Sequence, residues 1–506
     1  MANREPTGPD IVFFMLDQLA AKWLEVARAG AVPVPNFERL AEMGTNFTRC
    51  VSSNPLCCPA RATLATGLST RGHGVLQNGY YLDGSLPTFM RALQEAGYRT
   101  GALGKVHFRP HYSGLHPDYR PYGFDVQHIT EDGRGGEWLN WVRREHPQHA
   151  PAVYSTIWAR EIPEYADYGP DGEDLTAEMA GSPPLRGVYE LPFPAELSQT
   201  EWITGYALDF IATAETDRPL LAHISYVQPH SPFAPPAGYR DRVDMTKLPE
   251  PAPREWRDDP LGPGCFEGLA RIDNMEFGWE EVREHYFADL VHLDEQLGKV
   301  LAALESRGRL EETYIVLLSD HGEMLLDHGM VSKGEMHYDA CVRVPLLIAG
   351  PGLAQGTERD EFVQLEDIFP TVFEMAGLTV PEPLAMRLKL EHEVLPGRSL
   401  LPLCRGETMA DWRDAAYVES YNNIDSNTPA NWARTVRTAD WRYTMYPQGN
   451  GEQLFNLVDD PDEQVNRAGD PDYAAVRTEM RDRLMEALIL QDYPHTPRAR
   501  FAYDVH

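Results

Sequence analysis

The sequence has no apolar run long enough to cross a membrane. Its longest purely apolar stretch, Ile11 to Leu16, is far shorter than the ~20 residues that a transmembrane helix needs. The polar N-terminus, MANREPTGPD, lacks the basic segment, the longer apolar segment and the small-residue cleavage site of a secretion signal. We therefore expect a cytoplasmic protein without a membrane partner.

Basic residues are scarce relative to acidic ones. The 506 residues include 45 Lys and Arg against 77 Asp and Glu, which gives a formal net charge of −32. An acidic excess of this size repels nucleic-acid backbones and anionic lipid surfaces. A nucleic-acid partner is therefore not expected, and any small anionic ligand needs a local cluster of cationic side chains.

Cysteines are also few. The chain has six of them, too few in 506 residues to form the disulfide framework of a small secreted protein. Two of the six, Cys57 and Cys58, are adjacent in the sequence. Because cross-linking does not account for this pair, it needs another explanation.

What the chain does contain is an alternation of short apolar runs with helical patterns. This alternation is typical of an α/β fold with a mostly parallel, mixed sheet between two layers of helices. Apolar residues at spacings of three and four between Val282 and Arg307 predict a long amphipathic helix, and Ser85 to Gly97 predicts a shorter one. The expected strands are Ile11 to Leu16, Arg99 to Leu103, Leu220 to Tyr226, Tyr314 to Leu318 and Val344 to Ile348.

The pattern divides the chain into two parts. A main α/β domain is expected over residues 1–385, with irregular insertions near 109–197 and 231–264. Long irregular insertions in a compact domain often form functional rims, so both are candidate specificity loops. A C-terminal subdomain is expected over residues 399–506. Within it, Trp441 to Tyr446 and Gln453 to Leu457 predict a small antiparallel sheet, and Tyr473 to Leu490 predicts a terminal helix.

The segment CCPARATLATG, from Cys57 to Gly67, predicts a short helix. Pro59 suits the first turn of a helix and Gly67 suits its end. Residue 57 would then lie where unpaired backbone N–H groups face an anion. The alternative is a buried cysteine pair that only caps the helix. A Cys-x-Pro-x-Arg match is expected far less than once by chance in a chain of this composition, which favours a functional motif.

This segment resembles the type I sulfatase signature, C-x-P-x-R-x-x-x-L-T-G, at every fixed position except Ala65, where the family usually has leucine. Type I sulfatases and the similar phosphonate monoester hydrolases belong to the alkaline phosphatase superfamily. The resemblance implies an alkaline-phosphatase-like fold and a Cys57 that a formylglycine-generating enzyme converts to Cα-formylglycine during maturation. Cys58 does not fit the register of the signature, so we expect it only to pack.

The conversion matters because the hydrate of an aldehyde carries two hydroxyl groups on one carbon. One hydroxyl can attack a sulfur or phosphorus atom, and the other can later expel the bound sulfate by re-forming the aldehyde. A thiol cannot carry out that second step. The resemblance therefore implies covalent catalysis at residue 57.

Two polar motifs follow predicted strands. Asp17 and Gln18 end the first strand, and Asp320 and His321 follow a later one. Such residues often form only turns or helix caps. Ligands gather at the carboxyl ends of strands in open α/β sheets, however, so both motifs can converge with residue 57. The resemblance implies that the four side chains and a hydroxyl of formylglycine 57 bind one divalent cation, with Ca²⁺ first and Mn²⁺ as the alternative because of the histidine.

Five further basic residues lie in motifs similar to those of the family: Arg61 in the signature, Lys105 and His107 in G-K-x-H, His230 in P-H-x-P, and Lys333 after D-H-G. Taken singly, each would more often be an ordinary core or surface residue. The resemblance implies that Arg61 and Lys105 hold formylglycine and an ester oxygen, and that His107 is the base for sulfate release. His230 and Lys333 would bind the ester and stabilise or protonate the leaving oxygen. Together with the metal, these cations would give the anionic substrate a strongly positive binding surface.

The expected substrate is a small anionic ester. We expect a sulfuric ester hydrolase for aryl or small alkyl sulfates. The alternative is a phosphonate monoester or phosphodiester hydrolase, or an enzyme promiscuous for both, because Gln18, the Asp320–His321 pair and a substrate-binding Asn78 resemble that branch. A protein that binds such esters without acquiring formylglycine is a third possibility, which an unmodified Cys57 would indicate. A homo-oligomer is compatible with the sequence.

Overall fold

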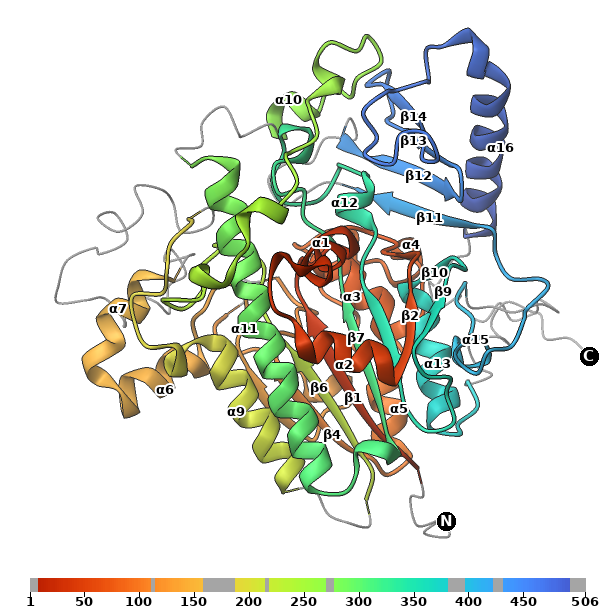
Figure 1. Cartoon of the computed structure of the whole chain (residues 1–506). Helices are drawn as coiled ribbons and strands as arrows, with labels where there is room; N and C mark the ends of the chain where they lie inside the picture. The colour runs from red at the N-terminus through yellow and green to blue at the C-terminus, as the bar shows by residue number, and fades with distance from the viewer. Residues whose placement is uncertain are drawn as a thin grey trace, which may run out of the picture.

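The computed structural model describes residues 8–110, 114–157, 187–213, 218–269, 277–380, 396–421 and 431–491. These residues form a large mixed sheet of eight strands with helices on both faces, and a second, four-stranded antiparallel sheet toward the C-terminus (Figure 1). The architecture is the α/β class that the sequence predicts.

The strands of the large sheet follow the order β5-β4-β6-β1-β7-β8-β2-β9. Neighbours are parallel except around β8, which is antiparallel to both β7 and β2. All five predicted strands are present, although β8 begins at Leu346 rather than at Val344. The strands are β1 (Asp10–Leu16), β2 (Gly44–Phe47), β4 (Arg99–Gly104), β5 (Val126–Ile129), β6 (Leu220–Ser225), β7 (Thr313–Ser319), β8 (Leu346–Ala349) and β9 (Thr357–Arg359), with β3 (Cys50–Val51) and β10 (Val363–Gln364) forming a separate pair.

Strand β1 lies inside the sheet and is buried along its whole length. Successive side chains of a strand point to opposite faces, so β1 contributes to two cores at once. Val12, Phe14 and Leu16 join the core on one face, and Ile11, Phe13 and Met15 join the core on the other. Burial on both faces explains why this strand reads as an unbroken apolar run.

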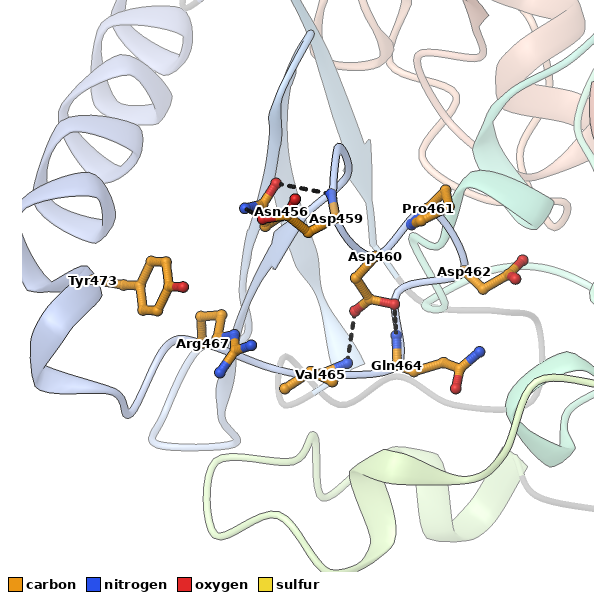
Figure 2. A pocket seen from close by; sticks show the side chains of 9 residues that line it. All are labelled: Asn456, Asp459, Asp460, Pro461, Asp462, Gln464, Val465, Arg467 and Tyr473. Carbon is orange, nitrogen blue, oxygen red and sulfur yellow. Dashed lines mark hydrogen bonds between the residues drawn. The ribbon is translucent and has the colours of Figure 1, made fainter.

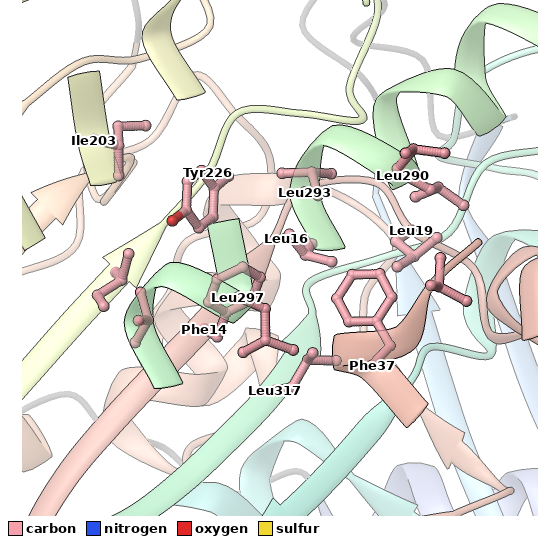
Figure 3. Packing of buried hydrophobic residues seen from close by; sticks show 14 of the residues in the cluster. Phe14, Leu16, Leu19, Phe37, Ile203, Tyr226, Leu290, Leu293, Leu297 and Leu317 are labelled. Atoms are coloured by element: carbon pink, nitrogen blue, oxygen red, sulfur yellow. The ribbon is translucent and has the colours of Figure 1, made fainter. Parts of the chain in front are cut away.

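The first core is covered by α9 (Gln199–Ala212) and α11 (Trp279–Ser306). Figure 3 shows Leu293 and Leu297 of α11 packed near Phe14 and Leu317 of the sheet. The long helix predicted between Val282 and Arg307 is therefore confirmed.

The opposite face carries α3 (Cys57–Thr66), α5 (Phe89–Glu95) and α13 (Ile368–Met375). Helix α5 begins later than predicted, because the Thr88 side chain caps it by accepting the backbone N–H of Arg91 at 3.2 Å. The remaining α-helices are α1 (Ala21–Val26), α2 (Pro35–Met43), α4 (Thr70–His73), α6 (Glu137–Glu145), α7 (Ala150–Ser155), α10 (Phe266–Leu269), α12 (Asp339–Val342), α15 (Leu401–Cys404) and α16 (Ala474–Leu490). Among the helices of the described residues, none is both long and apolar enough to cross a membrane.

Part of the first predicted insertion, residues 109–197, is regular rather than irregular. It supplies the edge strand β5, which pairs with β4, and helix α6. The strand gives little signal because it has four residues, of which only Ile129 is buried. The second insertion, residues 231–264, contains the short turns Arg240–Arg242, Met245–Lys247 and Glu255–Arg257.

The second sheet consists of β11 (Ala415–Ser420), β12 (Ala433–Thr438), β13 (Trp441–Met445) and β14 (Glu452–Asn456) in that order, all antiparallel. Met480 and Leu484 of α16 pack against Tyr443 and Leu454 of this sheet. The predicted small antiparallel sheet and terminal helix are confirmed. The segment expected to separate the two domains falls mostly on residues 381–395, outside the described residues, so the division itself stays a prediction.

Candidate active site

The site lies at the carboxyl ends of two adjacent strands. β1 and β7 are parallel neighbours in register, with Leu16 opposite Ser319. Asp17 and Asp320 directly follow these two residues, so the sheet brings them together although they are far apart in the sequence. This is the edge of an open α/β sheet where ligands gather.

Helix α3 brings Cys57 to the same place. The chain enters this helix from the extended residue Leu56, and Gly67 ends it in the left-handed conformation with φ 68°. All ten residues of α3 are buried. The Cys57 Sγ lies 3.1 Å from His321 Nε2 and 4.0 Å from Asp17 Oδ1. The predicted nucleophile and both predicted ligand pairs therefore meet in space.

Four side chains form a compact set of metal donors. One ligand atom from each of Asp17, Cys57, Asp320 and His321 lies within 4.8 Å of all the others. The His321 Nδ1 faces the carbonyl oxygen of Gly322 at 3.1 Å, an arrangement that places the proton on Nδ1 and leaves Nε2 as a lone-pair donor. Burial lowers the pKa of His321, which also favours the neutral, ligating form. Two carboxylates and an imidazole nitrogen fit one divalent cation.

The hydrogen bonds of Gln18 differ from those of the other predicted metal ligands. Its backbone N–H donates to Asp320 Oδ1 at 3.1 Å, its amide nitrogen donates to Glu323, and its amide oxygen accepts from Lys333. Its φ of 68° is uncommon for a residue other than glycine and marks a constrained turn. The contacts orient the Gln18 side chain firmly, whereas its role as a ligand stays a prediction.

Arg61 bridges the two carboxylates. Its Nε lies 2.8 Å from Asp320 Oδ2, and its Nη2 lies 3.2 Å from Asp17 Oδ2. Burial would lower the pKa of the guanidinium, but Asp320 and Asp17 raise it above its ordinary value. The Nη1 group donates to the carbonyl oxygen of Lys105 and to Ser225 Oγ, each at 3.0 Å. Arg61 therefore holds the carboxylates in place, which the sequence did not indicate.

Lys105 is paired with two carboxylates, those of Asp17 and Asp132. Burial would lower the pKa of the Lys105 ammonium, but Asp132 and Asp17 together hold it well above its usual range. Asp132 is not among the predicted site residues. The positive charge predicted for the binding surface is thus partly neutralised by carboxylates of the protein.

His107 lies beside the predicted nucleophile. A nitrogen of its ring, the Cys57 Sγ and an Asp132 oxygen lie within 4.8 Å of one another. The His107 backbone has φ 55°, and its N–H donates to Glu131 Oε1 at 3.0 Å. The Tyr119 hydroxyl donates to the same oxygen at 2.8 Å, so Glu131 fixes the turn that carries His107.

His230 and Lys333 contact each other directly, Lys333 Nζ to His230 Nε2. The His230 Nδ1 lies 2.7 Å from the carbonyl oxygen of Ser231, which places the proton on Nδ1 and leaves Nε2 as the acceptor. Burial and the neighbouring Lys333 lower the pKa of His230 to about 3. The imidazole is therefore neutral near pH 7, and its Nε2 faces Lys333 Nζ.

Asn78 contacts the first turn of α3, the helix that carries Cys57. Its Oδ1 accepts the backbone N–H of Cys58 at 3.0 Å, and the Cys58 Sγ packs against the Asn78 carbonyl oxygen at 3.7 Å. Asn78, His230 and Lys333 are each 7% exposed, whereas Cys57 is fully buried. These three side chains are therefore slightly more accessible than Cys57.

The sequence missed several residues of the site. Ser225 ends β6, Glu323 follows His321 in an already recognised motif, and Glu131 and Asp132 follow β5. Glu131 and Asp132 could have been predicted. They follow β5, which is the parallel neighbour of β4, and Lys105 follows β4, so all three residues lie at the same edge of the sheet. The two acidic residues were missed because the segment reads as an irregular insertion.

A second cluster of acidic residues lines a surface pocket of about 310 Å³ in the C-terminal region (Figure 2). Asp460 accepts the backbone N–H groups of Gln464 and Val465 at 2.9 and 2.8 Å, which folds the loop back on itself. Asp459 and Asp462 are exposed. The pocket contains none of the predicted site residues.

A sequence model described as Sulfatase matches residues 9–378 of the chain. The chain belongs to the sulfatase family. A second model, described as N-sulphoglucosamine sulphohydrolase, C-terminal, matches residues 326–489 of this sulfatase. The two matches together cover nearly all described elements from β1 to α16, and they identify the chain as a sulfatase-type enzyme.

Several known proteins resemble this sulfatase over almost their whole length. An arylsulfatase of Clostridium perfringens is 27% identical, with 92% of this chain and 91% of the relative covered. A choline-sulfatase of Rhizobium meliloti is 28% identical, with 92% and 83% covered. The crystal structure of a phosphonate monoester hydrolase of Agrobacterium radiobacter has a TM-score of 0.76 and 27% identity, with 96% of each chain covered. The fold is therefore shared by sulfatases and phosphonate monoester hydrolases.

Proposed function

We propose that this enzyme hydrolyses aryl or small alkyl sulfate monoesters, using formylglycine at position 57 and one divalent cation. The observation that carries the proposal is the convergence of Cys57 with Asp17, Asp320 and His321 at one sheet edge. The arylsulfatase and choline-sulfatase relatives support the same reaction class.

The residues around Cys57 suit a modified side chain better than a reactive thiol. Burial, followed by Asp17, raises the pKa of the Cys57 thiol to about 12, so little thiolate forms near pH 7. A formylglycine hydrate would supply the attacking hydroxyl and a second hydroxyl for sulfate release. His107 lies close enough to this side chain to accept a proton there.

The metal donors and the cations divide the remaining tasks. Asp17, Asp320 and His321, with Gln18 as a further candidate, would hold the cation, Ca²⁺ first and Mn²⁺ as the alternative. Such a cation lowers the pKa of a bound hydroxyl and offsets the charge of the ester. Lys333 presents N–H groups that His230 orients through its Nε2, so this pair can stabilise or protonate the leaving oxygen.

A phosphonate monoester or phosphodiester hydrolase is the second candidate. It is favoured by the similarity to the phosphonate monoester hydrolase of Agrobacterium radiobacter and by Gln18, His321 and Asn78. Sulfate monoesters, phosphonate monoesters and phosphodiesters each carry one negative charge, so one pocket can accept all three. Promiscuity between them is part of the proposal.

The test uses protein co-produced with a formylglycine-generating enzyme and loaded with Ca²⁺ or Mn²⁺. Mass analysis of the Cys57 peptide should show the aldehyde, and kcat/KM should be larger for an aryl sulfate than for an aryl phosphonate monoester. The Cys57→Ala variant should be inactive on both. A preference for the phosphonate would reverse the ranking, and full activity with an unmodified thiol would refute the formylglycine mechanism.

A further inference from the structure

Asp132 is the one acidic residue of the described site that combines contact with a cation, closeness to the nucleophile and no place in the metal donor set. It follows β5, is 3% exposed, and pairs with Lys105 Nζ. Its Oδ2 lies 3.9 Å from His230 Nε2. An Asp132 oxygen also lies within 4.8 Å of the Cys57 Sγ. The carboxylate therefore borders the space where the ester must react.

Asp132 changes the charge that an incoming ester meets. Arg61 is already engaged by Asp17 and Asp320, and Lys105 is shared between Asp17 and Asp132. Lys333, by contrast, contacts the uncharged groups of Gln18 and His230. The positive charges of Arg61 and Lys105 are therefore largely offset by carboxylates. The negative charge of Asp132 lies close to Cys57, where the ester would bind.

Two other carboxylates of the site, those of Glu131 and Glu323, bind groups that hold the loops of the site in place. Glu131 holds the backbone of Val106 and His107, and Glu323 holds Gln18 and the backbone of Ser332. Asp132, by contrast, contacts the side chains of Lys105 and His230, which face the nucleophile. Its charge therefore acts on the ester itself.

We propose that Asp132 is a specificity-determining residue, whose carboxylate admits singly charged esters and disfavours doubly charged phosphate monoesters. The inference rests on the proposed function and narrows its substrates to monoanions. Repulsion in a buried site grows with the charge of the ligand, so a dianion is penalised about twice as strongly as a monoanion by the same carboxylate. Sulfate monoesters, phosphonate monoesters and phosphodiesters pass this filter, and phosphate monoesters do not.

The test compares 4-nitrophenyl sulfate with 4-nitrophenyl phosphate at about pH 8.5, well above the second pKa of a phosphate ester near 6. Asp132→Asn keeps the shape and removes the charge, and Lys105 retains Asp17 as a partner. We expect the ratio of kcat/KM for phosphate to kcat/KM for sulfate to rise at least tenfold. Asp132→Glu, which restores the charge, should keep the parental ratio, as should the exposed control Asp459→Asn. A purely structural role would lower both kcat/KM values together and leave the ratio unchanged.

A binding measurement separates this inference from the proposed function. In a Cys57→Ala background with excess Mn²⁺, calorimetry gives Kd for both esters without turnover. Adding Asp132→Asn, or Asp132→Ser if the first variant does not fold, should shift the phosphate-to-sulfate ratio of affinities at least tenfold toward phosphate. An unchanged ratio overturns the inference even if the parent hydrolyses sulfate esters. A parent that hydrolyses neither ester overturns the proposed function, while the binding ratio still decides the role of Asp132.

Discussion

The molecule contains two clusters of acidic side chains, one assembled from positions far apart in the sequence and one formed by a single short segment. Asp17, Asp320 and Asp132 are buried at the sheet edge, and each contacts a buried Arg or Lys. In the C-terminal pocket, Asp459 and Asp462 are exposed, and Asp460 binds backbone N–H groups of its own loop (Figure 2). The first cluster is held by buried cations from distant elements. The second is exposed, and although Asp462 pairs with Lys22 at 2.8 Å, Asp460 is held by its own loop.

The comparison teaches that burial with partners from several elements distinguishes a functional cluster from a structural loop. Taking a carboxylate out of water costs several kcal/mol unless cations and N–H groups compensate for it. A fold that places Arg61 and Lys105 beside buried carboxylates, with a candidate metal site among them, offsets this cost with cations from several elements. Asp459 and Asp462 of the acidic C-terminal loop are exposed to water and need less compensation, and the exposed ion pair of Asp462 with Lys22 contributes little.

The largest expected difference between the clusters comes from removing one charge in each. Asp320→Asn should lower kcat/KM for an aryl sulfate by about 10³-fold or more, because a metal donor and the partner of Arg61 lose their charge together. Asp459→Asn should leave kcat/KM and the melting temperature nearly unchanged, as for most exposed substitutions. Bound metal per chain, measured for both variants, should fall only for Asp320→Asn. Equal losses in the two variants would remove the distinction.

A second experiment asks whether His230 acts on the leaving oxygen. His230→Ala should lower kcat/KM by about 10²- to 10⁴-fold for an alkyl sulfate, whose leaving group needs a proton, and by less for a nitrophenyl sulfate. A matched control is His223→Phe, because His223 is also buried and neutral but packs against Phe13 and Phe124 of the core. The control should show no dependence on the leaving group. Equal losses for both esters in His230→Ala would assign His230 to binding alone.

Asp289 of α11 allows a test of whether every buried carboxylate needs polar or cationic partners. Its Oδ2 has no hydrogen-bond partner within the described part of the chain, and burial raises its pKa to about 8. Between its ordinary pKa of about 3.9 and about 8, the unfolded state holds fewer protons than the folded one, so the free energy of unfolding falls as pH rises. The fall is at most about 1.4 kcal/mol per pH unit.

Asp289→Asn removes this dependence without changing the shape of the side chain. The melting temperature of the variant relative to the parent should therefore increase as pH rises from about 4 to about 8, and then level off. Thermal denaturation across that range provides the measurement. A difference that stays constant with pH would show that Asp289 keeps an ordinary pKa in the fold.

Much of the fold follows from local patterns, and the limits of prediction have physical causes. β1 and β7 are buried on both faces and read as apolar runs, and α11 has a clear helical period. β5 was missed because an edge strand with one buried residue has almost no pattern. The start of α5 was misplaced because the Thr88 cap, rather than Pro87, sets it.

The site residues were predicted from motifs, and their mutual contacts were not. The resemblance implied that Arg61 and Lys105 hold formylglycine and an ester oxygen. It gave no information about which carboxylates lie beside these two cations. The structure pairs Arg61 with Asp320 and Lys105 with Asp132. Pair interactions of this kind arise from the packing of strands distant in sequence, so a single sequence does not reveal them.

Because Cys57 is fully buried, its proposed conversion to formylglycine must precede the completion of folding. A converting enzyme cannot reach a side chain with no exposed surface in the finished fold, so it must act on the nascent chain. His321, which covers the Cys57 Sγ, lies 264 residues further along the chain. At roughly 5–20 residues per second, the ribosome needs on the order of tens of seconds to synthesise that stretch. Because β7 lies late in the sequence, the helix that carries Cys57 stays incompletely covered during translation, which leaves time for the proposed modification.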